Sequence, residues 1–193
     1  MPPKSKFKKE EIINAALDIT RIDGLKAVTA RALGDKLGTS PKPIFGLFEN
    51  MDEVQDEVIK ATRGIYDRYV EEGLNNEDMP AFKGVGMKYI EFAISEPKLF
   101  QLLFMQEQPE KPNLTNVLPI IDDNYDKILK SVKDEYRLSK KLSERLYRHL
   151  WIYTHGIAVL CATNMCTFTA KEMSNMLTEV HISVLNKIKG EAK

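Results

Sequence analysis

The sequence predicts an all-α protein of about nine helices. Apolar residues recur at helical spacing along most of the chain, several helix starts carry recognisable caps, and no stretch shows the apolar–polar alternation typical of a strand. An apolar share of 43% in 193 residues is ample for a globular core. We expect a three-helix domain in residues 1–50 and a helical body in residues 51–193.

The first helix is predicted from about Lys8 to Ile22. Ile12 and Ala16 belong to its apolar stripe, and Gly24 follows the last periodic residue. The next two helices supply a partner for this stripe. A unit of this size is too small to be very stable alone, so we expect packing against the body to stabilise it.

The second helix begins after Thr29, whose hydroxyl can cap it. Leu33 and Leu37 fall on one face, and Gly38 follows as a left-handed stop. About two turns of helix are predicted.

The third helix is predicted to begin at Pro41, with Ser40 as its cap, and to reach Phe48. Ile44 and Phe48 face inward at helical spacing. The two helices and their tight turn have the shape of a helix-turn-helix, which would turn the remaining side chains of the third helix toward DNA. Those residues are Lys42, Phe45 and Gly46. The pattern alone also fits an ordinary helical hairpin inside a core.

Six further helices are predicted in the body. Proline, serine or threonine marks the start of most of them, and Thr169 to Glu172 forms a capping box. Their approximate ranges are 52–73, 80–95, 97–105, 119–136, 139–164 and 169–190. Residues 150–162 are apolar nearly all round, so we expect that segment to pack against a partner chain as well as its own core.

Charge is balanced overall, with 28 basic and 28 acidic residues. Residues 1–50 are mildly basic, holding nine Lys or Arg against six Asp or Glu. Four lysines near the amino terminus could lie against phosphates or form a solvated tail. They are Lys4, Lys6, Lys8 and Lys9.

Other classes of protein find little support in the sequence. The start of the chain is not a signal peptide and no apolar run approaches membrane-spanning length, which predicts a cytoplasmic protein and no membrane partner. Cys161 and Cys166, placed in one helix on different faces, are expected to be reduced. No metal-ligand spacing, catalytic motif or cofactor motif is present, so we expect no enzyme, metal or bound cofactor.

Five segments together resemble the amino-terminal domain of TetR-family bacterial transcriptional regulators, in order and spacing. They are residues 12–17, Gly24, residues 28–34, residues 38–40 and residues 44–48. Residues 89–100 and Trp151 to Gly156 are similar to one type of carboxy-terminal domain in this family. The resemblance covers nearly the full chain and weakens in residues 107–140.

This resemblance implies a homodimeric repressor with a three-helix reading head and a ligand-binding body. The last two helices would form the dimer, and a small molecule would release the protein from double-stranded operator DNA. The residues implied at the DNA are Thr29, Arg31, Thr39, Ser40, Pro41, Lys42, Phe45 and Gly46.

Two positions depart from the family pattern. Phe45 stands where the family often has tyrosine, and Met51 where it often has lysine. Both family residues usually contact phosphate. We therefore expect the salt dependence of DNA binding to be shallower by roughly two units than in a relative that carries the tyrosine and the lysine. A helical sensor or adaptor that has lost DNA binding is therefore the alternative function.

The body is rich in aromatic residues, which favours an apolar or aromatic effector. The candidate pocket residues are Tyr66, Tyr69, Tyr89, Phe92, Phe104, Tyr125, Trp151 and His155. Aromatic residues at helical spacing are also what an ordinary helical core contains. His155 is expected to bond a neighbouring helix.

Overall fold

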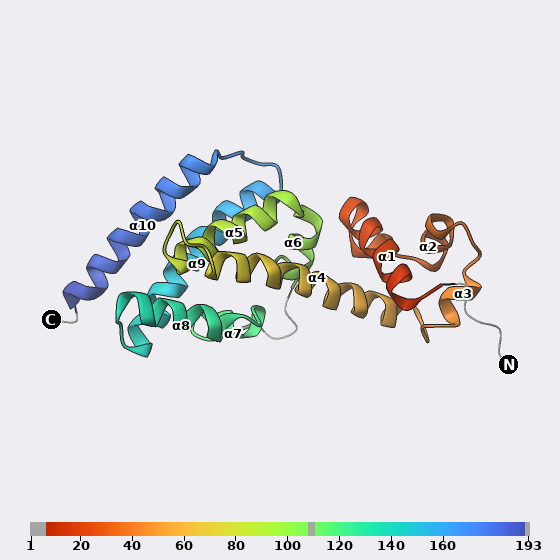
Figure 1. The fold of residues 1–193 in the computed structure, drawn as a ribbon, viewed down its shortest axis with the longest axis horizontal. Helices are drawn as coiled ribbons and strands as arrows, with labels where there is room; N and C mark the ends of the chain where they lie inside the picture. The colour runs from red at the N-terminus through yellow and green to blue at the C-terminus, as the bar shows by residue number, and fades with distance from the viewer. Residues whose placement is uncertain (1–6, 108–110, 192–193) are drawn as a thin grey trace. The chain divides into compact units, whose positions relative to one another are not determined.

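The computed structural model describes residues 7–107 and 111–191 (Figure 1). Its described residues form α-helices and one short 3-10 helix, with no strand, which confirms the all-α prediction. These residues hold ten α-helices where about nine were expected for the chain. Their bounds are α1 Lys9–Asp23, η1 Leu25–Ala27, α2 Ala30–Leu37, α3 Lys42–Phe45, α4 Met51–Leu74, α5 Ala81–Ser95, α6 Pro97–Phe104, α7 Val117–Ile121, α8 Tyr125–Tyr136, α9 Lys140–Ala162 and α10 Ala170–Glu191.

The extra helix arises because the predicted helix over 119–136 is two helices. α7 ends at Ile121, and the Asp122 carboxylate accepts the backbone N–H of Asn124 at 2.9 Å. This local turn competes with helix continuation, as aspartate and asparagine often do. α8 then begins at Tyr125.

Two other helix limits differ from the prediction. α3 has four residues, since Pro41 occupies the N-cap position and Ser40 does not cap it. Ile44 N–H bonds Pro41 C=O at 3.1 Å, and the N–H that Pro43 lacks would have had no intrahelical partner in this first turn. α10 continues through Gly190 to Glu191, where Arg145 of α9 holds the Glu191 carboxylate.

Residue contacts group the chain into two compact units. Unit 1 holds the described residues up to Ile65 together with Lys98–Gln106, and unit 2 holds Tyr66–Pro97 and the described residues from Glu107 onward. The predicted functional division into residues 1–50 and 51–193 stays a prediction.

Unit 1 has a core contributed by α1, α2, α3 and the first half of α4. Its fully buried side chains include Ile12, Leu33, Ile44 and Val54. Ile12 lies on the predicted stripe of α1, and Leu33 and Ile44 lie on the predicted inward faces of the two short helices. Apolar burial of these side chains therefore fixes which faces of α2 and α3 remain outside.

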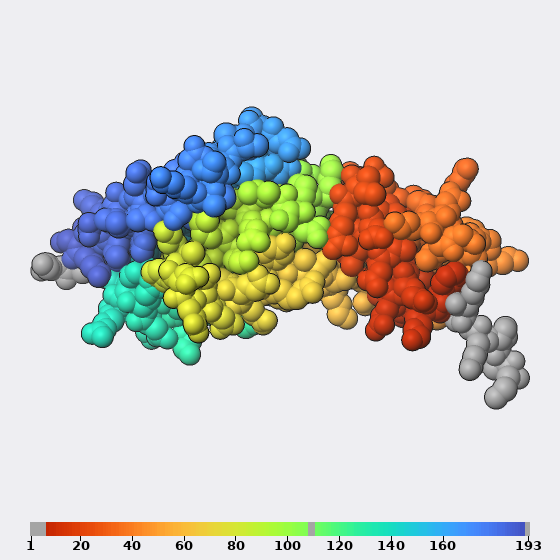
Figure 2. Space-filling view, turned by 45° about the horizontal axis from the view of Figure 1, so that its top comes forward, coloured from red at the N-terminus to blue at the C-terminus, as the bar shows by residue number. Residues whose placement is uncertain are grey.

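Unit 2 is organised around α9, which packs against α5, α8 and α10. α10 runs as a long helix along one face of this unit (Figure 2). α4 and α5 cross closely where two glycines meet, because a Cβ on Gly73 would lie 2.7 Å from Val85 Cα and one on Gly84 would overlap the Gly73 carbonyl oxygen. Glycine is required at both positions for this approach.

Candidate functional site

The first candidate site is the outer edge of α2 and α3, which we name the recognition surface. Its members are Thr29, Arg31, Thr39, Ser40, Pro41, Lys42, Phe45 and Gly46, all within unit 1. Seven of these eight residues are exposed and Thr39 is half-buried. The structure thus brings the residues implied by the family resemblance onto one connected segment with solvent access.

The turn between α2 and α3 has a defined geometry. Thr29 caps α2 by accepting the Ala32 N–H at 3.1 Å, and Gly38 takes the left-handed conformation with φ of 63°. Both features confirm the sequence prediction. Thr39 N–H bonds Gly34 C=O at 2.9 Å, and a Cβ on Gly34 would lie 2.8 Å from Thr39 O. The turn therefore lies directly against the α2 backbone.

Exposed polar and aromatic groups crowd the recognition surface. The Arg31 side chain is 93% exposed, and its guanidinium is 4.0 Å from the Asp35 carboxylate one turn along α2. Such a pair is weak in water, so the guanidinium remains available to another anion. Phe45 is 48% exposed although it is a large aromatic residue. An aromatic face can contact a thymine methyl group, and arginine and lysine can contact base edges or phosphates.

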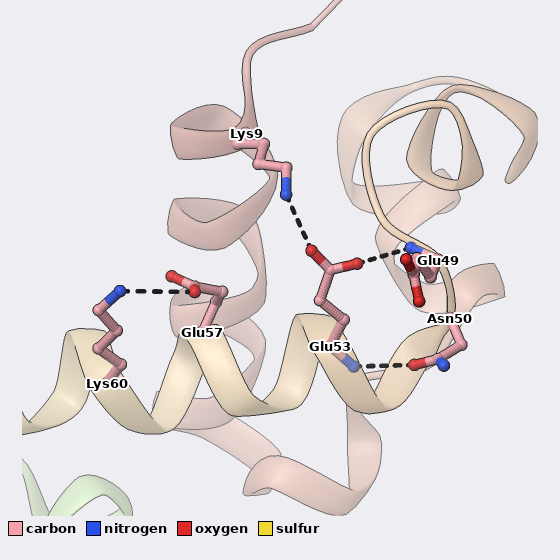
Figure 3. A network of polar contacts seen from close by, with 6 residues as sticks. All are labelled: Lys9, Glu49, Asn50, Glu53, Glu57 and Lys60. Atoms are coloured by element: carbon pink, nitrogen blue, oxygen red, sulfur yellow. Dashed lines mark hydrogen bonds and ion pairs between the residues drawn. The ribbon is translucent and has the colours of Figure 1, made fainter.

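A network of polar contacts joins α1 to the start of α4 (Figure 3). Lys9 Nζ lies 2.8 Å from a Glu53 carboxylate oxygen and 4.7 Å from the centre of the Phe48 ring. The other Glu53 oxygen accepts the Glu49 N–H at 2.6 Å, while Asn50 Oδ1 accepts the Glu53 N–H. The Lys9 bond, followed by that from Glu49, lowers the pKa of Glu53.

Lys9 therefore belongs to the packing of unit 1. The sequence left open whether Lys9 lies against phosphates or in a solvated tail; in the structure it begins α1, and its ammonium pairs with Glu53 and lies over the Phe48 ring. Lys8 is the N-cap residue of α1, and its backbone N–H donates to Glu11. Lys4 and Lys6 lie outside the described residues.

The second candidate site is a cavity of about 50 Å³ within unit 2. Side chains from α4, α5, α8, α9 and α10 and from the α7–α8 connection line it. They are Tyr66, Phe82, Lys83, Val85, Gly86, Tyr89, Asp122, Ile128, Tyr147, Leu150, Trp151, Thr154, Leu177 and His181. Most of this lining is apolar or aromatic, as is usual for sites that bind small molecules.

A buried acid lies at the wall formed by α4 and the α7–α8 connection. Tyr66 Oη donates to the Asp122 carboxylate at 2.8 Å, and Asn124 Nδ2 donates to the Asp67 carboxylate at 2.7 Å. Burial raises the pKa of Asp122, while the bonds from Asn124 and Tyr66 oppose that rise. These two bonds attach the second half of α4 to the connection before α8.

An aromatic cluster lies beside this acid. The Tyr66 and Tyr89 rings meet edge to face with centroids 6.0 Å apart, and Trp151 stacks on His155 at 5.1 Å. Tyr89 Oη and His155 Nδ1 are 2.9 Å apart, which confirms the expected bond from His155 to a neighbouring helix. Burial lowers the pKa of His155. The imidazole is therefore neutral near pH 7.

Three predicted pocket residues, Tyr66, Tyr89 and Trp151, line the cavity. The other five do not. His155 contacts Tyr89 and Trp151, and Tyr125 stacks on Tyr147 with ring centroids 5.7 Å apart. Tyr69 and the fully buried Phe92 pack together at 5.2 Å. Phe104 contacts Phe100 in unit 1.

Sequence reasoning missed the polar lining residues Lys83, Asp122, Thr154 and His181. Only Asp122 carried a local signal, because the Asp-Asp-Asn run at 122–124 is typical of a turn. Lys83 and His181 lie on the regular helices α5 and α10, and no local pattern distinguishes them from other helix residues.

The described residues contain no group of three or more His, Cys, Asp or Glu that could hold a metal ion. Over that same part of the chain, no helix is both long enough and apolar enough to cross a membrane. Cys161 and Cys166 are free thiols, and Cys166 lies beyond the end of α9, contrary to its predicted place inside that helix.

No family model matches the chain. It is 19% identical over 163 residues to the uncharacterised HTH-type transcriptional regulator YobS of Bacillus subtilis strain 168. The aligned region covers 84% of this chain and 83% of YobS.

Two solved structures resemble it over nearly their whole length. One is a Clostridium perfringens protein named for a role in regulating fatty acid metabolism, with a TM-score of 0.59 and 16% identity over 93% of this chain and 97% of the other. The second is the fatty acid degradation regulator FadR of Bacillus halodurans, with a TM-score of 0.59 and 15% identity over 94% and 97% of the two chains. This chain shares their fold.

Proposed function

We propose that this chain is a sequence-specific, DNA-binding transcriptional regulator of the TetR type, with no enzymatic role. The observation that carries this proposal is the recognition surface. Its apolar neighbours Leu33 and Ile44 are fully buried, while Arg31, Lys42 and Phe45 face solvent on the same two helices. A helix-turn-helix reads the major groove with the exposed side of its second helix.

In this proposal residues 1–50 read DNA, and residues 51–193 bind an effector and form a homodimer. Ile152 of α9 is 47% exposed and Ile182 of α10 is 52% exposed, although both belong to long amphipathic helices. Exposed apolar residues on the last two helices are suited to an interface with a second copy of the chain. Two reading heads would then contact two half-sites of a roughly palindromic operator.

The cavity of unit 2 supports release of DNA by a small molecule. α4 supplies residues 51–65 to unit 1 and contributes Tyr66 to the cavity wall. An effector that binds one arrangement of this wall more tightly shifts the population of conformations toward it. Repression follows if the arrangement without effector is the one that binds the operator.

Selection of bound duplexes from a random DNA pool at near-physiological salt tests the proposed function. An enriched inverted repeat is the expected result, since a symmetric dimer reads symmetric half-sites. A Lys42→Gln variant should enrich the repeat less strongly. A folded, dimeric protein that enriches no sequence would exclude sequence-specific DNA binding and favour the sensor without DNA binding.

A further inference from the structure

Some of the polar groups that line the unit-2 cavity have hydrogen-bond partners within the protein, and one does not. Asp122 accepts from Tyr66, and Tyr89 bonds His155. His181 Nε2, in contrast, is buried and has no hydrogen-bond partner among the described residues. A buried polar atom without a partner is costly, and a ligand can supply the missing bond.

Lys83 of α5 lines the same cavity as His181 of α10. Lys83 Nζ donates to Thr178 Oγ1 at 2.9 Å, and Thr178 Oγ1 donates its own proton to Ser174 C=O at 2.7 Å. An ammonium has three N–H donors, so the Thr178 bond leaves Lys83 able to donate to a ligand. The α5–α10 side of the cavity thus offers donors to an oxygen acceptor.

Charges of both signs lie near the His181 side of the cavity. Glu135 acts on His181 as a negative charge, and Lys83 and Lys189 act on it as two positive charges. The buried Asp122 carboxyl lines the cavity from the α7–α8 connection. Repulsion from Asp122 would direct an anionic head toward Lys83 and His181.

The remaining lining is suited to an apolar body. Five aromatic side chains contribute to it, namely Tyr66, Phe82, Tyr89, Tyr147 and Trp151. At about 50 Å³ the cavity is smaller than the several hundred Å³ of a typical ligand site. Ligand binding therefore has to displace lining side chains, which provides the change of arrangement that release of DNA requires.

We propose that the unit-2 cavity binds small apolar carboxylates, with the carboxylate bonded to Lys83 and His181 and the apolar body among the aromatic side chains. This inference names the effector class of the proposed regulator and rests on that function for its biological role. Burial lowers the pKa of His181, so the ring is neutral before binding and can donate through Nε2 in one of its two tautomers.

Trp151 makes the inference testable without DNA. It is the single tryptophan of the chain and lines the cavity, so its fluorescence reports on binding there. The probes are 3-phenylpropanoate, 3-phenylpropanamide and 3-phenylpropylamine, which share an apolar body and differ in the head group. We expect the carboxylate to bind at least tenfold more tightly than the other two, a difference of about 1.4 kcal/mol.

Two variants test the assigned head-group contacts. Lys83→Gln removes the charge and keeps a donor for Thr178, and His181→Phe keeps a ring against Tyr136, whose centroid lies 4.8 Å away. Each should weaken binding of the carboxylate about tenfold or more and weaken binding of the uncharged amide much less. Lys88→Gln is the matched control, because Lys88 is also on α5 but bonds Glu72 and Glu91 outside the cavity lining.

Several outcomes would overturn the inference. These are equal affinity for carboxylate and amide, tightest binding of the amine, no Trp151 response to the carboxylate, and full carboxylate affinity in both folded variants. Because this titration contains no DNA, it is independent of duplex selection. If the protein binds 3-phenylpropanoate but enriches no duplex, the proposed function is refuted and the inference about the ligand class stands.

Discussion

Unit 1 and unit 2 place their polar side chains in opposite ways. On the recognition surface of unit 1, Arg31 and Lys42 extend into solvent, while apolar side chains of the same two helices, Leu33 and Ile44, are fully buried. In unit 2, Tyr66, Tyr89 and Asp122 are buried around a cavity and bond one another or a neighbouring helix. The first arrangement is suited to a large charged partner, and the second to a small molecule enclosed by the protein.

This difference predicts whether a substitution changes partner binding, stability or both. Exposed residues of unit 1 can be changed with little loss of stability, so they should alter partner binding alone. Buried polar groups of unit 2 support both stability and ligand binding, because an unpaired partner remains when one is removed. The four predictions below test this separation, from the largest expected effect to the smallest.

The largest effect is expected for Gly84→Ala in unit 2. A Cβ at this position would overlap the Gly73 carbonyl oxygen where α4 and α5 cross, so the helices have to separate. The free energy of unfolding should fall by about 3 kcal/mol, at the upper end of overpacking effects. Urea denaturation followed by circular dichroism measures this change.

Gly64→Ala is the control for Gly84→Ala. Gly64 lies in α4, and a Cβ there would meet nothing within 4 Å. The better helix propensity of alanine should stabilise the protein by about 1 kcal/mol. Equal effects of the two substitutions would contradict the close crossing of α4 and α5.

Gly34→Ala should weaken DNA binding through the turn of unit 1. The added Cβ would lie 2.8 Å from Thr39 O, so the turn between α2 and α3 has to shift. We expect at least a tenfold loss of affinity for a selected duplex, or about 1.4 kcal/mol, measured by fluorescence anisotropy. Ligand binding reported by Trp151 should remain. Loss of ligand binding would show that this substitution in unit 1 also affects unit 2.

Stability should depend on pH through the buried histidines of unit 2. Burial lowers the pKa of His155 and His181, so the unfolded chain takes up protons first as pH falls below the ordinary value of 6.5. The two histidines therefore lower the free energy of unfolding as the pH falls from 6.5 toward 5, and they do not lower it above that range. The urea midpoint should therefore decrease between pH 7 and pH 5.

His155→Gln should reduce this pH dependence, because the substitution removes one of the two groups. A pH dependence identical in the His155 variant and the original protein would refute the assignment to that imidazole.

The smallest effect is expected for Asp35→Asn on α2. The Asp35 carboxylate lies beside Arg31 and would repel a DNA phosphate bound there. Duplex affinity should rise a fewfold at low salt and approach that of the original protein at high salt. A decrease in affinity at low salt would indicate that Asp35 orients Arg31 productively.

Local signals predicted most of the helices. Thr29, Ser139 and Thr169 cap α2, α9 and α10 as expected, because a capping side chain and its N–H partner lie within a few residues. The break at Asp122 was missed since apolar residues keep helical spacing on both sides of it. There, the local bond between Asp122 and Asn124 overrides the periodicity.

The cavity could be predicted only in part. Tyr66, Tyr89 and Trp151 were singled out as aromatic residues of the body, but the same criterion also selected Phe104, which lies in unit 1. Lys83 and His181 come together because α5 and α10 pack in the folded chain. Such pairing between distant segments is not encoded in local periodicity.

Binding of the selected duplex to the Arg31→Gln/Lys42→Gln variant tests the central claim most directly. The matched control is Lys26→Gln/Lys130→Gln, which removes the same charge from two exposed residues outside the recognition surface. The account predicts at least a hundredfold loss of affinity, a salt dependence shallower by roughly two units, and an unchanged melting temperature for the first variant alone. Equal affinity of the two variants for the duplex would contradict DNA reading by α2 and α3.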